Sequence, residues 1–217
     1  MLSVMPRLVL ASASPARRTT LTRAGLSPTV VVSSVDEDAV VARYGVADAQ
    51  DVALVLARAK AEDVAAGQYG QDALVLGCDS VLELDGEVHG KPVDAAEAIS
   101  RWRRMRGRTG VLHTGHWVVD SRDPADPDDP GTGATLGAVA STTVHFAELS
   151  DAEIGAYVGT GEPLAVAGGF TTDGLGGPFV RGIEGDHHNV VGVSLPLLRE
   201  LLADIGVPWV SLWGSPI

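Results

Sequence analysis

The sequence predicts an α/β protein in which helices flank a central, twisted, mixed β-sheet arranged in two lobes. Helical segments with capping residues alternate with short apolar runs typical of strands, which is the pattern of this fold class. A strong hairpin-turn signal at Asp85-Gly86 places antiparallel pairing in the middle of the chain. The 217 residues are 45% hydrophobic, so the chain can bury a core large enough for a single domain.

Composition narrows the class of function. A formal net charge of −12 argues against a broad nucleic-acid-binding surface, although a cleft with a few cations could still bind a small phosphorylated ligand. No apolar run is long enough to span a membrane, and the run at residues 8–11 is too short for a signal peptide, which favours a cytoplasmic protein. The single cysteine, Cys78, cannot form an internal disulfide or a cysteine-rich zinc site.

The start of the chain predicts a binding site for an anion. A strand at residues 8–10 leads into a helix over residues 15–24, which a serine cap and a proline begin. Ser12, Ser14 and Arg17 gather where the first backbone N–H groups of that helix are free, an arrangement suited to phosphate. The alternative is a surface helix with ordinary exposed arginines.

Two further elements carry candidate side chains. A strand at residues 29–33 is followed by acidic residues at 35–38, which are either metal ligands, with Glu37 among them, or a solvated loop. A helix over residues 48–66 has one ridge that is apolar except for Lys60. Lys60 either extends its ammonium along the surface into water or emerges into a cleft beside the sheet.

The stretch at residues 77–94 is the centre of the prediction. A buried strand at residues 73–76 ends in a glycine and presents Asp79 and Ser80 at its end, and a second strand continues to the hairpin. The returning strand, residues 87–89, ends just before Lys91. Aspartate and lysine on strand ends could hold a divalent cation with its phosphate ligand, or they could belong to an ordinary solvated hairpin.

The second half of the chain continues the alternation of helices and strands. Four arginines of the helix at 95–106, Arg101, Arg103, Arg104 and Arg106, are expected to face outward or toward a partner. A run rich in Pro, Asp and Gly predicts a mobile surface loop at residues 121–137, and the C-terminal tail, residues 207–217, packs back or meets a second subunit of a homodimer. The other expected elements are a strand at 110–120, a strand at 138–146, a helix at 150–158, a glycine-rich run at 162–177, a strand pair at 179–183 and 189–193, and a helix at 195–205.

Eight short motifs, in order, resemble the Maf family of nucleoside triphosphate pyrophosphatases, also described as septum-formation-inhibitor Maf-like proteins. They are ASASPARR, VDE, LARAKA, GCDS, GKP, EPLAVAG, DGLGG and NVVGVSLPLL. The resemblance extends over about residues 8–202 and leaves the tail outside the match. The resemblance implies a two-lobed Maf/ITPase-like fold with a nucleotide cleft between the lobes. It also implies hydrolysis of a nucleoside triphosphate to the monophosphate and pyrophosphate with a divalent cation, Mg²⁺ or Mn²⁺.

The resemblance also assigns roles to residues. Ser12 and Arg17 match the phosphate-binding start of the family, and Glu37 its acidic metal-side residue. Lys60 and Lys91 match the two lysines, and Asp79 matches the proton acceptor and lies on the metal side. Three further positions, Ala16, Ser80 and Asp173, correspond to those that divide the family by substrate.

The substrate stays open because Ala16, Ser80 and Asp173 match neither the dTTP and UTP branch nor the 7-methyl-GTP branch. A modified or non-standard nucleotide and 7-methyl-GTP are both retained. The main alternative function is a regulatory protein, linked to cell division, that senses a nucleotide in the same cleft. A nucleic-acid-associated protein is the poorest reading, because of the net negative charge.

Overall fold

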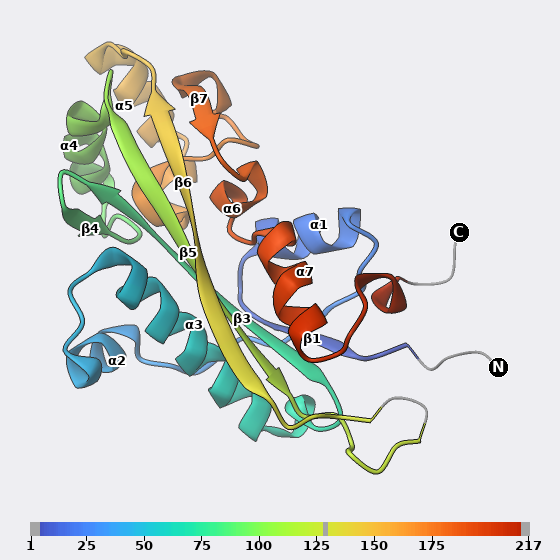
Figure 1. Ribbon diagram of the computed structural model, residues 1–217. Helices are drawn as coiled ribbons and strands as arrows, with labels where there is room; N and C mark the ends of the chain where they lie inside the picture. The colour runs from blue at the N-terminus through green and yellow to red at the C-terminus, as the bar shows by residue number, and fades with distance from the viewer. Residues whose placement is uncertain (1–4, 128–129, 214–217) are drawn as a thin grey trace.

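The computed structural model describes residues 5–127 and 130–213, and within them seven strands form one mixed sheet (Figure 1). The strand order is β2-β1-β3-β5-β6-β7, and β4 pairs with β3 off this path. β1 is parallel to β2 and β3, and the other pairs are antiparallel. The strands are β1 (Leu8–Ala11), β2 (Thr29–Val30), β3 (Leu74–Leu84), β4 (Glu87–His89), β5 (Thr109–Asp120), β6 (Thr135–Phe146) and β7 (Val180–Glu184).

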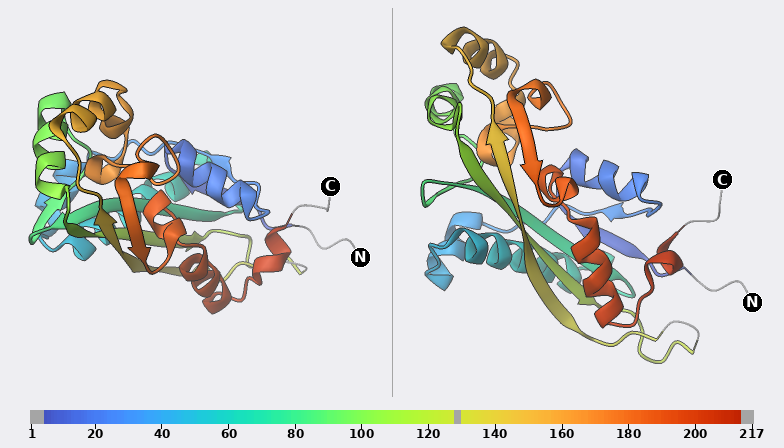
Figure 2. Two further views of the ribbon diagram at one scale, coloured as in Figure 1. Left: turned by 90° about the horizontal axis from the view of Figure 1, so that it is seen from above. Right: turned by 45° about the horizontal axis from the view of Figure 1, so that its top comes forward.

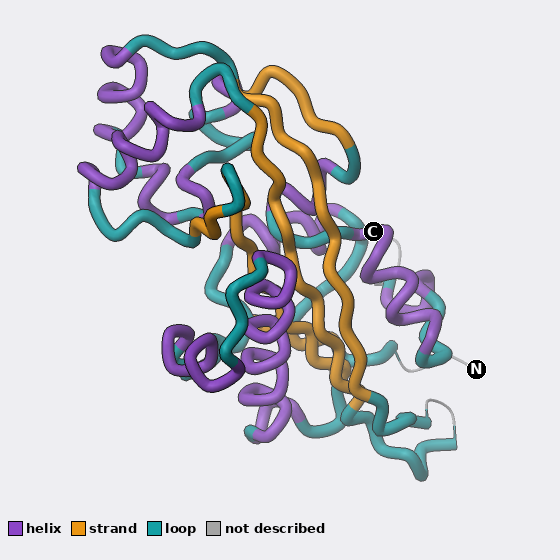
Figure 3. The backbone as a smooth tube through the Cα atoms, turned by 60° about the vertical axis from the view of Figure 1, so that its left-hand side comes forward, coloured by secondary structure: helices purple, strands orange, loops and turns teal. Residues whose placement is uncertain are grey.

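Helices cover both faces of the twisted sheet (Figure 2). α3 lies on one face, and α1 and α7 lie on the other (Figures 1 and 3). No helix among the described residues is both long and apolar enough to cross a membrane. The helices are α1 (Pro15–Arg23), α2 (Glu37–Tyr44), α3 (Ala49–Ala66), α4 (Ala95–Met105), α5 (Asp151–Gly159), α6 (His187–Val191) and α7 (Leu195–Asp204).

Two glycines allow α3 to lie unusually close to the sheet. A Cβ atom on Gly77 of β3 would lie 2.1 Å from the carbonyl oxygen of Ala57, and one on Gly115 of β5 would lie 2.2 Å from that of Ala53. Both carbonyls belong to α3, so any larger residue would push the helix away. This close packing fixes the depth at which the side chains of α3 meet β3.

The two larger hydrophobic clusters lie at opposite ends of β3. Leu74 and Leu76 pack with β1, α1 and α7 in the first cluster. Leu82 and Leu84 pack with α4, α5 and the end of β6 in the second, which contains Trp102 at its centre. The middle of β3, between the two clusters, carries the polar residues Asp79 and Ser80.

The structure corrects the predicted course of the central strand. β3 runs without interruption from Leu74 to Leu84 because β5 pairs with it along nearly its whole length. Asp79 and Ser80 therefore lie inside a strand, and the prediction that Gly77 ends the strand is wrong. Gly77 has no side chain, and this allows α3 to pack closely against β3 at that position.

Four other boundaries also differ from prediction. β2 is only two residues long, and the acidic residues after it begin α2, with Asp36 as the N-cap, where a loop was one alternative. β6 begins at Thr135, so the predicted loop at 121–137 ends earlier; residues 128–129 within it lie outside the description. The strand predicted at 189–193 is wrong, because this segment forms α6 and the turn after it.

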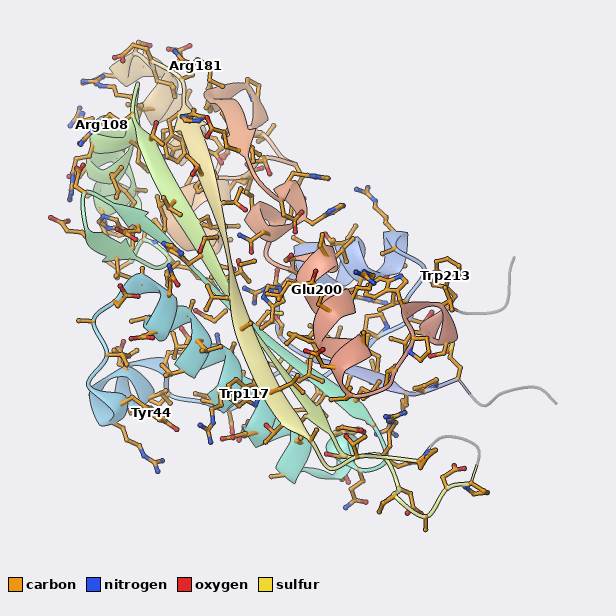
Figure 4. The ribbon with its side chains drawn as sticks, in the orientation of Figure 1. Tyr44, Arg108, Trp117, Arg181, Glu200 and Trp213 are labelled. Carbon is orange, nitrogen blue, oxygen red and sulfur yellow. The ribbon has the colours of Figure 1, made fainter. Side chains whose placement is uncertain are left out.

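The tail packs back onto its own chain as far as it is described. Val207 and Leu212 are buried in the cluster formed by β1, α1 and α7. The indole N–H of Trp213, which is labelled in Figure 4, donates to the carbonyl of Ala24 over 3.2 Å. The tail therefore covers the end of α1, which is one of the two predicted alternatives.

Candidate active site

The candidate site lies where the chain changes direction across the sheet. From β1 the chain passes over one face through α1 to β2, then returns over the other face through α3 to β3 on the opposite side of β1. In open α/β sheets such a switch point leaves a crevice outside the carboxyl ends of the strands, where ligands bind. Predicted residues of α1, α2, α3 and β3 converge at this point of the sheet.

The edge of β3 is uncovered at this point. β1 ends at Ala11, opposite Gly77, and β4 begins to pair only at Leu82. Asp79 and Ser80 lie in the interval between these two partners. The middle of β3 therefore has no strand neighbour on this edge, although both residues are buried.

An ion-paired cluster occupies the α3 face of this gap. The ammonium of Lys60 lies 2.5 Å from Oδ1 of Asp79 and 2.7 Å from Oε1 of Glu37. The side chains of Lys60 and Asp79 are only 12% and 11% exposed, whereas that of Glu37 is 55% exposed. The ammonium of Lys60 is thus turned toward the two carboxylates and is mostly buried.

Burial and neighbouring charges shift the pKa values of both partners of the buried pair. Burial raises the pKa of Asp79, and attraction to Lys60 and Arg17 offsets only part of that effect. Burial opposes the charged form of Lys60, but attraction to Asp79 and hydrogen bonds to both carboxylates outweigh it and raise the pKa of Lys60. An aspartate with a raised pKa beside a firmly charged lysine is suited to accepting a proton.

Arg17 occupies the opposite face of the gap and is held by four hydrogen bonds. Its guanidinium donates to Ser12 Oγ (3.0 Å), the Cys78 carbonyl (2.8 Å), Ser80 Oγ (2.9 Å) and the Gly192 carbonyl (2.7 Å). None of these acceptors is a carboxylate, and Arg17 has no ion-pair partner within the part of the chain that is described. Its positive charge is therefore fixed in place and available to an anion.

The two serines of the predicted phosphate site, Ser12 and Ser14, are hydrogen-bonded to Arg17 and to each other. Ser14 caps α1 by accepting from the backbone N–H of Arg17 (3.4 Å), and its own N–H donates to Ser12 Oγ (3.2 Å). An open depression of about 470 Å³ begins beside Ser14 and continues along the outer side of α1 past Arg18 and Arg23. This depression includes none of the three residues of the ion-paired cluster.

The acidic residues have the donor atoms that a divalent cation requires. Mg²⁺ and Mn²⁺ prefer carboxylate oxygens and are commonly held by one or two carboxylates together with substrate phosphates. Asp79 Oδ2 and Glu37 Oε2 accept no hydrogen bond from the residues that the structure describes. Glu37 and Asp79 therefore fit such an ion, with Lys60 between them.

Two predicted residues are not brought to this cluster. Lys91 is exposed, and it makes no side-chain hydrogen bond or ion pair within residues 5–127 and 130–213. Asp173 is exposed on the loop before β7. Ala16, by contrast, lies half-buried in the first turn of α1, next to Arg17.

Ser80 is placed differently from a residue that would contact a ligand directly. It is buried, and its hydroxyl joins Arg17 to Thr114 Oγ1 (2.9 Å), which in turn donates to the Asn189 carbonyl (3.1 Å). Because neighbouring residues of a strand face opposite sides, Ser80 points toward α1 while Asp79 points toward α3. Ser80 therefore supports the position of Arg17.

Sequence reasoning missed two residues that organise the surroundings. Glu162 accepts hydrogen bonds from Tyr157, Thr171 and the backbone N–H groups of Leu175 and Gly176, which fixes the loop that carries Asp173. The only signal was its position before the glycine-rich run.

Arg101 is the second missed residue, because it was expected to face outward or toward a partner and is instead 5% exposed within its own chain. Its guanidinium donates to the Gly90 carbonyl over 2.6 Å and pairs with Glu97. The backbone N–H of Gly168 donates to the same carbonyl over 3.0 Å. These contacts anchor the backbone immediately before Lys91.

Comparison with known proteins assigns the family. The model of the Maf-like protein family matches residues 7–205. A nucleoside triphosphate pyrophosphatase of Salinispora tropica is 57% identical over 211 residues, which cover 96% of this chain and 88% of the relative. Proteins of the same description from Streptomyces coelicolor (55% identical; 96% and 95% covered) and Mycobacterium ulcerans (50%; 97% and 98%) match similarly. The chain therefore belongs to the Maf-like protein family.

Proposed function

We propose that the protein is a nucleoside triphosphate pyrophosphatase, which hydrolyses its substrate to a nucleoside monophosphate and pyrophosphate. The observation that carries this proposal is the Lys60–Asp79–Glu37 cluster in the gap between β1 and β4, with the fixed charge of Arg17 on the other side. The description shared by the relatives supports the same reaction. A protein that only bound a nucleotide would not need the two acidic residues beside the lysine.

The cations of the site have the role of holding the triphosphate. Arg17 and Lys60 carry charge on either side of the edge of β3, and Ser12 and Ser14 contribute hydroxyls beside them. Lys91 has no partner of its own within the described residues, so its ammonium is free to meet the phosphates when they bind. These charges also stabilise the pyrophosphate as it leaves.

Asp79 has the role of general base. It accepts a proton from a water molecule as the water oxygen forms a bond to the α-phosphorus. The bond from that phosphorus to the oxygen bridging to the β-phosphorus breaks, and the electron pair leaves with pyrophosphate. Glu37 and Asp79 would hold the divalent cation, Mg²⁺ or Mn²⁺, and such an ion supplies polarisation of the phosphoryl oxygens.

We assign the selection of the nucleobase of the substrate to the residues around the crevice. Ala16 and Asp173 have side chains that a nucleoside could contact, whereas Ser80 acts through Arg17. Asp173 can accept hydrogen bonds from an exocyclic amine or a guanine edge, which keeps 7-methyl-GTP and other modified nucleotides as candidate substrates.

The proposal also includes the wider organisation of the protein. The two hydrophobic clusters at either end of β3 support two lobes with the crevice between them. We place the reaction in the cytoplasm and retain a homodimer as the candidate assembly.

A hydrolysis panel tests the function. The purified protein with Mg²⁺ or Mn²⁺ would be given the common nucleoside triphosphates, 7-methyl-GTP and several modified pyrimidine nucleotides, with pyrophosphate and phosphate measured separately. We expect pyrophosphate release, and a fall of at least about 100-fold in Asp79→Asn with nucleotide binding retained. Asp38→Asn, which changes an exposed carboxylate next to Glu37, is the matched control.

Two results would contradict the proposal. Turnover of Asp79→Asn at the parent rate would remove the assigned base. Nucleotide binding without pyrophosphate release from any substrate would favour the regulatory, nucleotide-sensing alternative.

A further inference from the structure

Three adjacent residues at the start of α6 form a second group of metal-ligand type, separate from Glu37 and Asp79. Ligand atoms of Asp186, His187 and His188 all lie within 4.8 Å of one another. We propose that these three side chains bind a transition-metal ion of the Zn²⁺ type. This site is independent of the divalent cation expected with the nucleotide.

Asp186 is positioned as a ligand before any ion arrives. Its Oδ1 accepts the backbone N–H of His188 over 2.9 Å, and its carbonyl accepts from Thr142 Oγ1 over 2.9 Å. Its Oδ2 is buried and has no hydrogen-bond partner among the residues that the structure describes. A buried carboxylate oxygen without a partner is costly, and a bound cation would remove that cost.

The two imidazoles leave nitrogen atoms free for a metal. The ring centroids of His187 and His188 lie 3.8 Å apart, and His187 makes no hydrogen bond or ion pair to any residue that the structure describes. His188 Nδ1 lies 3.4 Å from Asp186 Oδ1, and its Nε2 makes no hydrogen bond or ion pair within residues 5–127 and 130–213. By contrast, His116 and His145 each use both ring nitrogens in hydrogen bonds.

The donor set selects the kind of ion. Two imidazoles and one carboxylate suit Zn²⁺, Co²⁺ or Ni²⁺, whereas Mg²⁺ prefers oxygen alone. Zinc bonds of about 2.0–2.2 Å in a tetrahedral site place ligand atoms roughly 3.4 Å apart. The ligand atoms must therefore close by at most about 1.4 Å, the difference between 4.8 Å and the tetrahedral separation, which the exposed side chain of His187 can provide by changing rotamer. Water would complete the coordination.

The location of the group gives the ion a structural consequence. α6 is followed directly by Gly192, whose carbonyl accepts a hydrogen bond from Arg17 Nε. Within α6, the side-chain amide of Asn189 donates to the carbonyls of Leu112 (3.2 Å) and Ala140 (3.1 Å). An ion bound at Asp186 would fix the start of the segment 186–192, and Gly192 at the end of that segment contacts Arg17. We therefore expect binding to stabilise the folded protein.

Metal titration of the full chain tests the inference. Zn²⁺ would be titrated calorimetrically in excess Mg²⁺, which occupies sites made only of oxygen ligands, and the melting temperature would be measured in parallel. We expect one Zn²⁺ per parent chain, at least tenfold weaker binding in a His187→Ala/His188→Ala variant, and a rise in melting temperature only where Zn²⁺ binds. His145→Ala is the matched control, because it removes a histidine paired with a single carboxylate.

The outcomes separate this site from the proposed reaction. Equal Zn²⁺ affinity in the parent and the double variant, loss of binding in His145→Ala, or no Zn²⁺ binding in the parent would each overturn the proposal. Circular dichroism of the double variant confirms that it is folded. Because no nucleotide is present, a failure here leaves the hydrolysis proposal untouched, and a failure of hydrolysis leaves this site untouched.

Discussion

Lys60 and Asp79 form a nearly buried ion pair between α3 and the middle of β3, with 2.5 Å between the ammonium and Oδ1. The pair occupies the stretch of β3 where one parallel neighbour has ended and the hairpin strand has not begun. Glu37 joins it from α2 and is more exposed, so solvent reaches the cluster on the Glu37 side. The position of Lys60 beside Asp79 therefore depends on how closely α3 packs against β3.

Removing the lysine leaves a buried carboxylate without its partner. We expect Lys60→Met to lower the free energy of unfolding by about 3 kcal/mol, because an uncompensated buried charge is costly. The double variant Lys60→Met/Asp79→Asn should recover much of this loss. Urea denaturation without metal measures both values. A double variant less stable than Lys60→Met would show that the two charges do not interact as described.

Gly77 is required for the approach of α3. A Cβ atom there would lie 2.1 Å from a backbone carbonyl, so Gly77→Ala should destabilise the protein by about 1–3 kcal/mol and lower hydrolysis by displacing Lys60. Gly155→Ala is the control, since no described atom beyond its chain neighbours and its own helix backbone lies within 4 Å of the added methyl group, and it should be neutral or slightly stabilising. Equal effects of the two substitutions in urea denaturation would contradict this role.

Arg17 depends on the shape of its guanidinium as well as on its charge. Lysine cannot reproduce four hydrogen bonds to separated acceptors, so Arg17→Lys should raise the KM for the nucleotide about tenfold and cost about 2 kcal/mol of stability. Arg18→Lys alters the neighbouring exposed arginine and should change neither quantity. Steady-state kinetics and denaturation of both variants decide the point, and similar losses in the two would count against the fixed-charge role.

Glu162 should control the order of the loop that carries Asp173. The backbone N–H groups of Leu175 and Gly176 each donate to its carboxylate over 3.0 Å. Glu162→Gln weakens these charge-assisted bonds, so hydrogen exchange at the two amides should accelerate at least tenfold. Glu153→Gln, which alters only the cap of α5, should leave them unchanged. Unchanged exchange in Glu162→Gln would remove Glu162 from this role.

His116 should make the protein less stable in acid. Burial lowers its pKa to about 4, while both ring nitrogens are hydrogen-bonded to backbone groups of Thr114 and Ser194. The unfolded chain, with a histidine pKa of about 6.5, binds the proton first, so stability falls as the pH drops from about 6.5 toward 4. At pH 5 the titration of His116 lowers the free energy of unfolding by about 2 kcal/mol.

His116→Gln removes this titration while keeping a donor and an acceptor at the position. Between pH 7.5 and 5 the parent should therefore lose about 2 kcal/mol more than the variant in urea denaturation. Parallel pH profiles of the two proteins would mean that the buried imidazole is not the group responsible.

Local signals in the sequence were sufficient for most elements. Ser14, Asp94 and Ser150 cap helices where predicted, because an N-cap depends only on the first turn that follows it. The Asp85-Gly86 turn has positive φ at both residues, as its hairpin requires. The order of the motifs, which extends over nearly the whole chain, was sufficient for the family.

Elements whose conformation depends on distant partners were predicted poorly. β3 continues through Gly77 because β5 pairs along it, and a glycine reads as a strand end when that partner is unknown. The segment 189–193 reads as a strand because Val190, Val191 and Val193 are apolar and β-branched. It is not a strand, and the side chain of Asn189 donates to carbonyls of β5 and β6. Arg101 reads as a surface residue because only the fold brings the Gly90 carbonyl to it.

The sequence alone determined which residue types were available for phosphate and metal chemistry, since their identities and their places beside caps and turns are local properties. The tertiary structure alone decided how they combine. Arg17 meets the carbonyl of Gly192 across 175 positions, and Lys60 meets Asp79 across 19, because the sheet brings the ends of separate segments to one edge. The physical reason is that burial, charge and hydrogen bonding act through space, so a side chain's role depends on neighbours that its position in the chain does not specify.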